Sequence, residues 1–243
     1  MRIAKLGGAL CLMALVTACG ATAGSRASGP ESPAAPTTSR VPAPPADKGP
    51  QCEGGKGPGG VHVLRGGTAA VPGGGGEVTY EGAGADGRHR TAVLSLGGTK
   101  RTVTAGQKVA LGGHAFTVAQ ICTYRVVLTT HQTSPDQQGA PMSNWPTTMD
   151  GRWRLRWHVP DNGPDFGAVV TDIQDGPARV SINAVSTARG PLAFYRDVRV
   201  GETVEIAGRL WKVAAIDPGN MNVDVGSREF RAGHVDLRVT GDA

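Results

Sequence analysis

The sequence predicts an all-β protein in which two tandem units, each a small β-sandwich or a partly open barrel, follow a disordered tether. Two observations carry this prediction. The first is composition: the 243 residues include 37 glycines and 17 prolines, only 5% are aromatic, and no long amphipathic helical pattern occurs. The second is an element that occurs twice, in which apolar residues alternate with other residues between glycines, as in strands joined by tight turns.

The repeated element comprises residues 103–121 and, 95 positions later, residues 198–216. Every position that recurs is apolar or glycine. The recurring pairs are Val103 and Val198, Gly106 and Gly201, Val109 and Val204, Leu111 and Ile206, Gly113 and Gly208, Phe116 and Trp211, Val118 and Val213, and Ile121 and Ile216. We therefore expect strands that turn at Gly106 and Gly113, and we interpret the element as scaffold. Its spacing resembles that of small β domains of unknown function in high-GC Gram-positive bacteria, a resemblance that implies a fold and no site residues.

The duplication extends beyond this element to the whole unit. The dipeptides Asp86-Gly87 and Asp175-Gly176 supply the positive φ that a tight hairpin needs. An offset of 92 carries Val61 onto Trp153, Val63 onto Leu155 and Val78 onto Val170. Further strands are expected at 61–63, 77–80, 91–96, 124–130, 221–225 and 234–239. We assign residues 51–131 to the first repeat, 132–150 to a linker and 151–243 to the second repeat; packing of both into one pseudo-symmetric sandwich is the alternative.

The N-terminus predicts export. Residues 1–18 have a short basic start, with Arg2 and Lys5, and then a short apolar run, which together are typical of a secretory signal. The run ends Val16-Thr17-Ala18-Cys19, which resembles the lipobox of bacterial lipoproteins. The resemblance implies that Cys19 becomes a diacylglyceryl-modified N-terminus anchored at the extracytoplasmic face of the cell membrane. An ordinary signal peptide with a coincidental cysteine is the alternative.

Residues 19–50 are rich in Ala, Pro, Ser and Thr, so they predict a disordered tether. Such a segment reaches roughly 30 Å as a coil and about 90 Å in polyproline form.

Of the four cysteines, Cys11 belongs to the signal and Cys19 to the lipobox, which leaves Cys52 and Cys122. Because exported chains mature in an oxidising compartment, we predict that these two form a disulfide. A redox pair or metal ligands are the alternatives.

One strand of the second repeat has two chemically different faces. Trp153, Leu155 and Trp157 alternate with Arg152, Arg154, Arg156 and His158. The basic residues are a candidate face for an anionic ligand, such as a wall polymer, lipid headgroups or an acidic protein. The alternative is a strand with its aromatic side in the core and its arginines in water.

The sequence indicates no catalytic residues, no cofactor and no metal site. No nucleophile turn, zinc-protease motif or phosphate-binding loop occurs, and the six histidines are scattered singly. The carboxylates Asp161, Asp165, Asp172 and Asp175 cluster in the second repeat and leave a wall-modifying hydrolase as an alternative.

A net charge of only +5 predicts no nucleic-acid partner. We expect a membrane-anchored, non-enzymatic binding or assembly module whose partner is an anionic wall polymer or another envelope protein.

Overall fold

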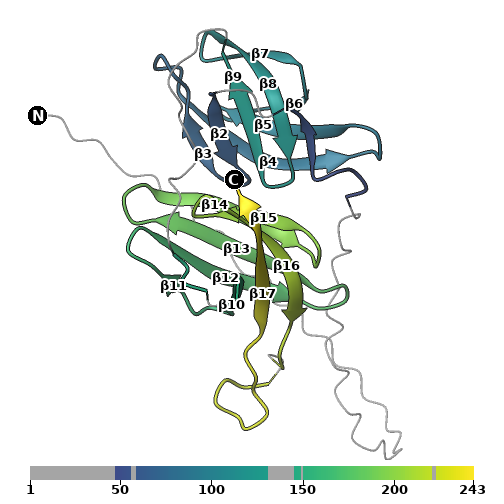
Figure 1. The fold of residues 1–243 in the computed structure, drawn as a ribbon, viewed down its shortest axis with the longest axis vertical. Helices are drawn as coiled ribbons and strands as arrows, with labels where there is room; N and C mark the ends of the chain where they lie inside the picture. The colour runs from purple at the N-terminus through teal and green to yellow at the C-terminus, as the bar shows by residue number, and fades with distance from the viewer. Residues whose placement is uncertain (1–46, 56–58, 131–144, 149, 221–222) are drawn as a thin grey trace, which may run out of the picture. The chain divides into compact units, whose positions relative to one another are not determined.

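The computed structural model describes residues 47–55, 59–130, 145–148, 150–220 and 223–243, which all belong to one compact unit. Among these residues every helix or strand is a β-strand, so the predicted all-β class is confirmed. The strands form four sheets, shown in Figure 1, and each ladder between named strands is antiparallel. Glycine-rich turns join many neighbouring strands, as the composition predicts.

Each repeat contributes two sheets. The strands of the first repeat are β1 (Cys52–Gly54), β2 (Val61–Leu64), β3 (Thr68–Ala70), β4 (Glu77–Ala85), β5 (Arg90–Leu96), β6 (Thr99–Thr104), β7 (Lys108–Leu111), β8 (His114–Cys122) and β9 (Arg125–Thr129). One sheet has the order β1-β8-β9-β2 with β7 also on β8, and the other has the order β3-β4-β5-β6. The two faces that meet between these sheets form an apolar core of valine, leucine, isoleucine and aromatic side chains.

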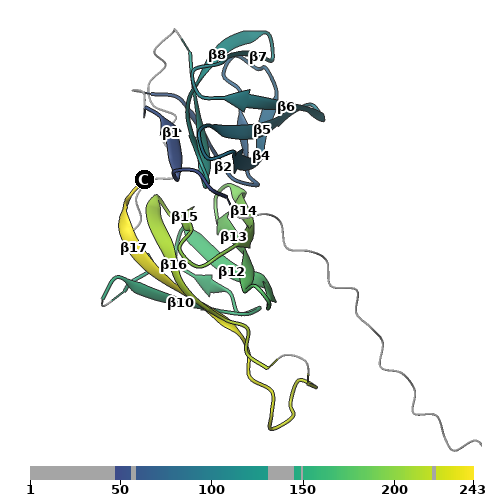
Figure 2. The same cartoon turned by 90° about the vertical axis from the view of Figure 1, so that its right-hand side faces the viewer.

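The second repeat has the same plan. Its strands are β10 (Arg152–Arg156), β11 (Asp161–Asn162), β12 (Phe166–Gln174), β13 (Arg179–Ser186), β14 (Gly190–Val198), β15 (Thr203–Ile206), β16 (Arg209–Asp217) and β17 (His234–Asp242). The sheets have the orders β10-β17-β16-β15 and β11-β12-β13-β14, which match β2-β9-β8-β7 and β3-β4-β5-β6. Figure 2 shows the two sheets of this repeat as separate layers, with β16 and β17 on one side and β12 and β13 on the other.

The repeated element forms the same hairpin in both units. Gly106 and Gly201 have φ values of 81° and 91°, and their amides donate to the Val118 and Val213 carbonyls. Nearly all of the recurring apolar side chains are buried. Burial of one such side chain typically contributes about 1.5–3 kcal/mol, so this hairpin stabilises the core of each repeat. The interpretation of the element as scaffold agrees with this placement.

The register of the duplication differs from the predicted one at β12. In the structure Val170 corresponds to Tyr80 and not to Val78, because Trp157 bridges Val170 as Arg65 bridges Tyr80. A bulge follows both residues, at 81 and at 171. The assignment at an offset of 92 was therefore wrong here by two residues. This two-residue difference preserves the alternation of buried and exposed side chains, because side chains two residues apart lie on the same face of a strand.

The predicted strand at 221–225 is also wrong in its described part. Residues 223–225 form bends and turns between β16 and β17, and Val225 is 78% exposed. The apolar alternation of Met221, Val223 and Val225 suggested a strand, but no neighbouring strand pairs with the described residues of this loop. The strand expected at 234–239 is present as β17 and extends to Asp242.

The disulfide between Cys52 and Cys122 is confirmed, with an S–S distance of 2.03 Å. The two cysteines are directly opposite partners in the ladder between β1 and β8.

Residues 47–50, which composition assigned to the tether, contact the first repeat through Arg90, which is fully buried. Arg90 donates from Nη1 to Asp47 over 2.5 Å and from Nε to the Pro50 carbonyl over 2.8 Å. The folded part of the chain therefore includes Asp47.

The two repeats contact each other through backbone and side chains. The Phe194 amide of β14 donates to the Arg65 carbonyl over 3.0 Å. An added Cβ at Gly66 or Gly67 would overlap the carbonyls of Phe194 or Leu192, so only glycine allows this approach. The buried side chains of Arg125 on β9 and Glu205 on β15 form an ion pair of 3.3 Å. These contacts place a polar cavity beside the junction.

Candidate functional site

Strand β10 has the two faces that its sequence predicts. Trp153 and Leu155 are buried, whereas Arg152, Arg154 and Arg156 are exposed. The Trp153 indole donates to the Asp161 carboxylate over 2.7 Å, and its ring lies 5.2 Å from that of Trp211. The aromatic side of the strand therefore belongs to the core of the second repeat, and the arginine side faces solvent.

His158 does not lie on this arginine face. Strand β10 ends at Arg156, and His158 occupies a turn with a φ of 53°. Its Nε2 donates to the Thr171 carbonyl over 2.9 Å, and its amide donates to the Val170 carbonyl. The corresponding residue of the first repeat is Gly66, whose φ is 68°. Inclusion of His158 in the face was wrong because the alternation stops where the backbone turns.

The structure extends the arginine face across three strands. Arg152 of β10 is directly opposite Arg238 of β17, and Arg238 is directly opposite Lys212 of β16. We call Arg152, Arg238 and Lys212 the basic row. All three residues are exposed, and none forms an ion pair with any residue that the structure describes. Like charges directly opposite one another destabilise a sheet, so the row has a cost to folding.

The acidic residues on the same face are paired locally. Arg154 donates to Asp236 through both Nε and Nη2, at 2.7 and 2.9 Å, and Arg231 pairs with Asp217. The hydrogen bond from Arg154 holds the pKa of Asp236 below its usual range, and the bond from Arg231 does the same for Asp217. These carboxylates favour the ionised form, and each forms its shortest ion pair with its own arginine, while His234 lies 3.8 Å from both. The charge of Arg152 also lowers the pKa of Asp236, and no member of the basic row forms an ion pair with a described residue.

The first repeat has no such row. The positions that correspond to Arg238 and Lys212 are Thr129 and Thr117, which are directly opposite each other on β9 and β8. The same scaffold therefore carries uncharged threonines in one repeat and a pair of cations in the other. The basic row is a difference between the repeats, not a requirement of the fold.

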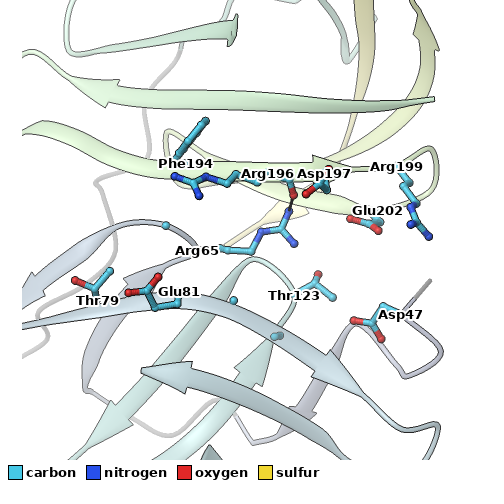
Figure 3. Close-up of a pocket in the computed structure, with 13 residues that line it drawn as sticks. Asp47, Arg65, Thr79, Glu81, Thr123, Phe194, Arg196, Asp197, Arg199 and Glu202 are labelled. Carbon is cyan, nitrogen blue, oxygen red and sulfur yellow. Dashed lines mark hydrogen bonds between the residues drawn. The ribbon is translucent and has the colours of Figure 1, made fainter. Parts of the chain in front are cut away.

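A second candidate site is a cavity of about 410 Å³ between β4 of the first repeat and β14 of the second (Figure 3). Three arginines line it: Arg65, Arg196 and Arg199. The Arg196 guanidinium lies over the Phe194 ring at 4.6 Å. This volume lies within the range of small-molecule sites.

Four carboxylates also line this cavity, and three of them have cationic partners. These pairs are Asp47 with Arg90 at 2.5 Å, Glu81 with Lys100 at 3.5 Å and Asp197 with Arg179 at 3.1 Å. The fourth is Glu202, in the turn before β15, and burial raises the pKa of its carboxyl group. The cavity therefore presents charges of both signs.

The carboxylates proposed for a hydrolase lie on and around two paired strands, with Asp161 on β11 and Asp172 on β12. Asp165 precedes β12 and Asp175 follows it, so the nine residues of this strand lie between them. At a rise of about 3.3 Å per residue, the two lie roughly 30 Å apart, whereas paired catalytic carboxylates lie about 5–9.5 Å apart. Asp161 pairs in register with Ala168 and accepts the Trp153 hydrogen bond, and Asp172 accepts one from Gln174. Asp165 and Asp175 therefore do not form a catalytic pair.

The predicted lipobox cannot be compared with the structure. Cys19 and the rest of the lipobox lie outside the described part of the chain. Within that part, no group of three or more His, Cys, Asp or Glu residues is arranged to hold a metal ion. No helix among the described residues has the length and apolar character needed to cross a membrane.

Sequence reasoning missed Arg238 and Lys212. The alternation of His234, Asp236 and Arg238 with buried Val235 and Leu237 marks one exposed face of β17, and that signal is present in the sequence. What the sequence does not contain is the register that places Arg238 between Arg152 and Lys212. The cavity was missed for a similar reason, because its walls come from both repeats.

Comparison with known proteins adds no match to these observations. No protein-family model, no curated protein and no solved structure matches this chain.

Proposed function

We propose that this protein is a lipid-anchored, extracytoplasmic module that binds an anionic polymer of the cell envelope and catalyses no reaction on it. The basic row is the observation that carries the proposal. Arg152, Arg238 and Lys212 lie on adjacent strands, which are spaced about 4.8 Å apart, so the row extends for roughly 10 Å. A linear array of cations matches a linear chain that carries a negative charge at regular intervals, such as a polymer of phosphodiesters.

Three further observations support the proposal. The row is absent from the first repeat, so selection for folding alone does not account for it. The carboxylates on the same face form their closest ion pairs with Arg154 and Arg231, and not with a member of the row. Among the carboxylates of the second repeat, Asp165 and Asp175 lie at opposite ends of β12, too far apart for a catalytic pair, and Asp161 and Asp172 accept hydrogen bonds from Trp153 and Gln174. Another envelope protein with an acidic surface remains the competing partner.

Attachment to the membrane is the part of the proposal that rests on Cys19. Cells that express the wild-type chain with a fatty-acid probe should incorporate the probe into this protein, and a Cys19→Ala variant should not. The physical reason is that each buried methylene contributes about 0.8 kcal/mol, so two acyl chains anchor a protein stably. Detection of the labelled band in gel-resolved membranes measures the result. Unlabelled wild-type protein would contradict the anchor.

Binding by the basic row is tested with a triple variant, Arg152→Gln, Lys212→Gln and Arg238→Gln. The purified folded domain (residues 47–243) should bind immobilised poly(glycerol phosphate) at low ionic strength, and this variant should bind about tenfold or more weakly because three phosphate contacts are lost. The matched control replaces Lys100, Arg101 and Lys108 of the first repeat with Gln, which removes the same charge from other exposed strands.

The control should retain wild-type affinity, because net charge alone is not expected to decide binding. Equal weakening of both variants would mean that only overall charge matters, and it would overturn the assignment to the row. Binding of the wild-type and control proteins, but not of the row variant, to vesicles of anionic phospholipid and not to the polymer would replace the polymer with a membrane surface. Circular dichroism should show the same strand content for all three proteins.

A further inference from the structure

The cavity between the repeats contains two polar side-chain atoms without a hydrogen-bond partner. They are Thr123 Oγ1 and Arg65 Nε, and both residues line the cavity. Thr123 is only 8% exposed, and Figure 3 shows its hydroxyl directed toward the strand that leads to Glu202. A buried donor without a partner is costly, and native proteins leave few of them. Both atoms are hydrogen-bond donors that an anionic group in the cavity would satisfy.

The backbone and side chain of Arg65 are fixed before any ligand arrives. Its amide donates to the Tyr124 carbonyl over 2.9 Å, and its carbonyl accepts the bond from Phe194. Its Nη2 donates to the Arg196 carbonyl over 3.4 Å, drawn as a dashed line in Figure 3, and its guanidinium lies 5.5 Å from the centre of the Tyr195 ring. A ligand therefore meets a positioned donor, which reduces the entropy lost on binding.

The opposite charge in the cavity is supplied by Glu202. Glu202 is half-buried; burial raises the pKa of its carboxyl group, and the charges of Arg65 and Arg199 act in the opposite direction. Each of the other three carboxylates of the wall forms an ion pair of 2.5–3.5 Å, and Glu202 is the wall carboxylate outside these three pairs. An ammonium group beside it would stabilise the ionised form.

We propose that this cavity binds a zwitterionic amino acid or the end of a short peptide. Its carboxylate accepts hydrogen bonds from Arg65 Nε and Thr123 Oγ1, and its ammonium group lies beside Glu202. The volume of about 410 Å³ is sufficient for a molecule of this size. This site is separate from the basic row and does not depend on the proposed polymer binding.

The test uses alanyl-alanine as the probe and amide chemical shifts of the protein as the readout, up to about 10 mM probe. The zwitterionic dipeptide should shift resonances of residues around the cavity and raise Tm. Its N-acetylated form, without the ammonium, and its C-terminal amide, without the carboxylate, should bind about tenfold or more weakly. No shifts with the zwitterion would overturn the proposal.

Thr123→Val is the decisive variant because it removes the hydroxyl and keeps the shape of the side chain. It should weaken the dipeptide about tenfold or more and leave the fold intact, and Glu202→Gln should weaken the free dipeptide but not its N-acetylated form. An unchanged affinity for Thr123→Val would mean that the hydroxyl meets only water, and it would also overturn the site. The basic-row variant should bind the dipeptide normally, which separates this proposal from the polymer proposal.

Discussion

Replacement of both Cys52 and Cys122 with alanine should lower the free energy of unfolding by about 4 kcal/mol. The disulfide closes a loop with a sequence separation of 70, and restriction of a loop of this length in the unfolded chain contributes roughly that amount. It also holds β1 against β8, at the start of the folded part. Guanidinium denaturation followed by circular dichroism, with the midpoint and slope fitted separately, measures the change.

Reduction provides the control for this prediction. A reductant should destabilise the wild-type protein by most of the same amount and leave the double variant unchanged. Cys122 is fully buried, so any additional loss in the variant reports the space left in the core. Identical denaturation midpoints for oxidised and reduced wild-type protein would show that the disulfide does not stabilise the fold.

Replacement of Glu205 with alanine should cost about 3–5 kcal/mol of unfolding free energy. The Arg125 and Glu205 side chains are 5% and 2% exposed, and their charged atoms lie 3.3 Å apart. Removal of the glutamate leaves the arginine charge buried without this partner, and the desolvation cost is no longer offset. Because the pair joins β9 to β15, the same variant should loosen the contact between the repeats. Urea denaturation and hydrogen exchange at these strands measure both effects.

The control for the ion pair is a double variant, Arg125→Met with Glu205→Leu. Apolar replacement of both partners of a buried pair is often neutral, so this protein should recover most of the stability that Glu205→Ala loses. Such a recovery shows that the loss came from an unpaired charge. A cost below about 1 kcal/mol for Glu205→Ala is the value of an exposed pair and would contradict the burial of these side chains.

Much of the scaffold could be predicted from the sequence because its signals are local. Alternating apolar residues between Gly106 and Gly113 define a hairpin without reference to the rest of the chain. The disulfide followed from counting cysteines in an exported chain, since only Cys52 and Cys122 remained. The two faces of β10 followed from the period of a strand.

The candidate sites could not be predicted in full because they depend on contacts distant in sequence. Arg152 and Arg238 are 86 residues apart, and only the ladder between β10 and β17 makes them neighbours. Arg125 and Glu205 lie 80 residues apart and meet only where the repeats contact each other. His158 shows the opposite error: the alternation continues in the sequence, but the backbone turns before it.

The disulfide and the basic row lie in different repeats, whereas the cavity takes its lining residues from both. The first repeat carries the disulfide and the buried Arg90, which fix residues 47–54 to the fold. The second repeat carries the basic row on an exposed sheet face. A duplicated scaffold allows this division because the core positions recur while the exposed positions are free to differ.

The salt dependence of polymer binding tests the central proposal most directly. The affinity for poly(glycerol phosphate) should fall linearly with ionic strength on logarithmic axes, because each cation that contacts a phosphate releases counterions. The row variant should have a slope shallower by about 2, and the Lys100, Arg101 and Lys108 control should keep the wild-type slope. Equal slopes for wild type and row variant would show that Arg152, Lys212 and Arg238 do not contact the polymer and would contradict the proposed function.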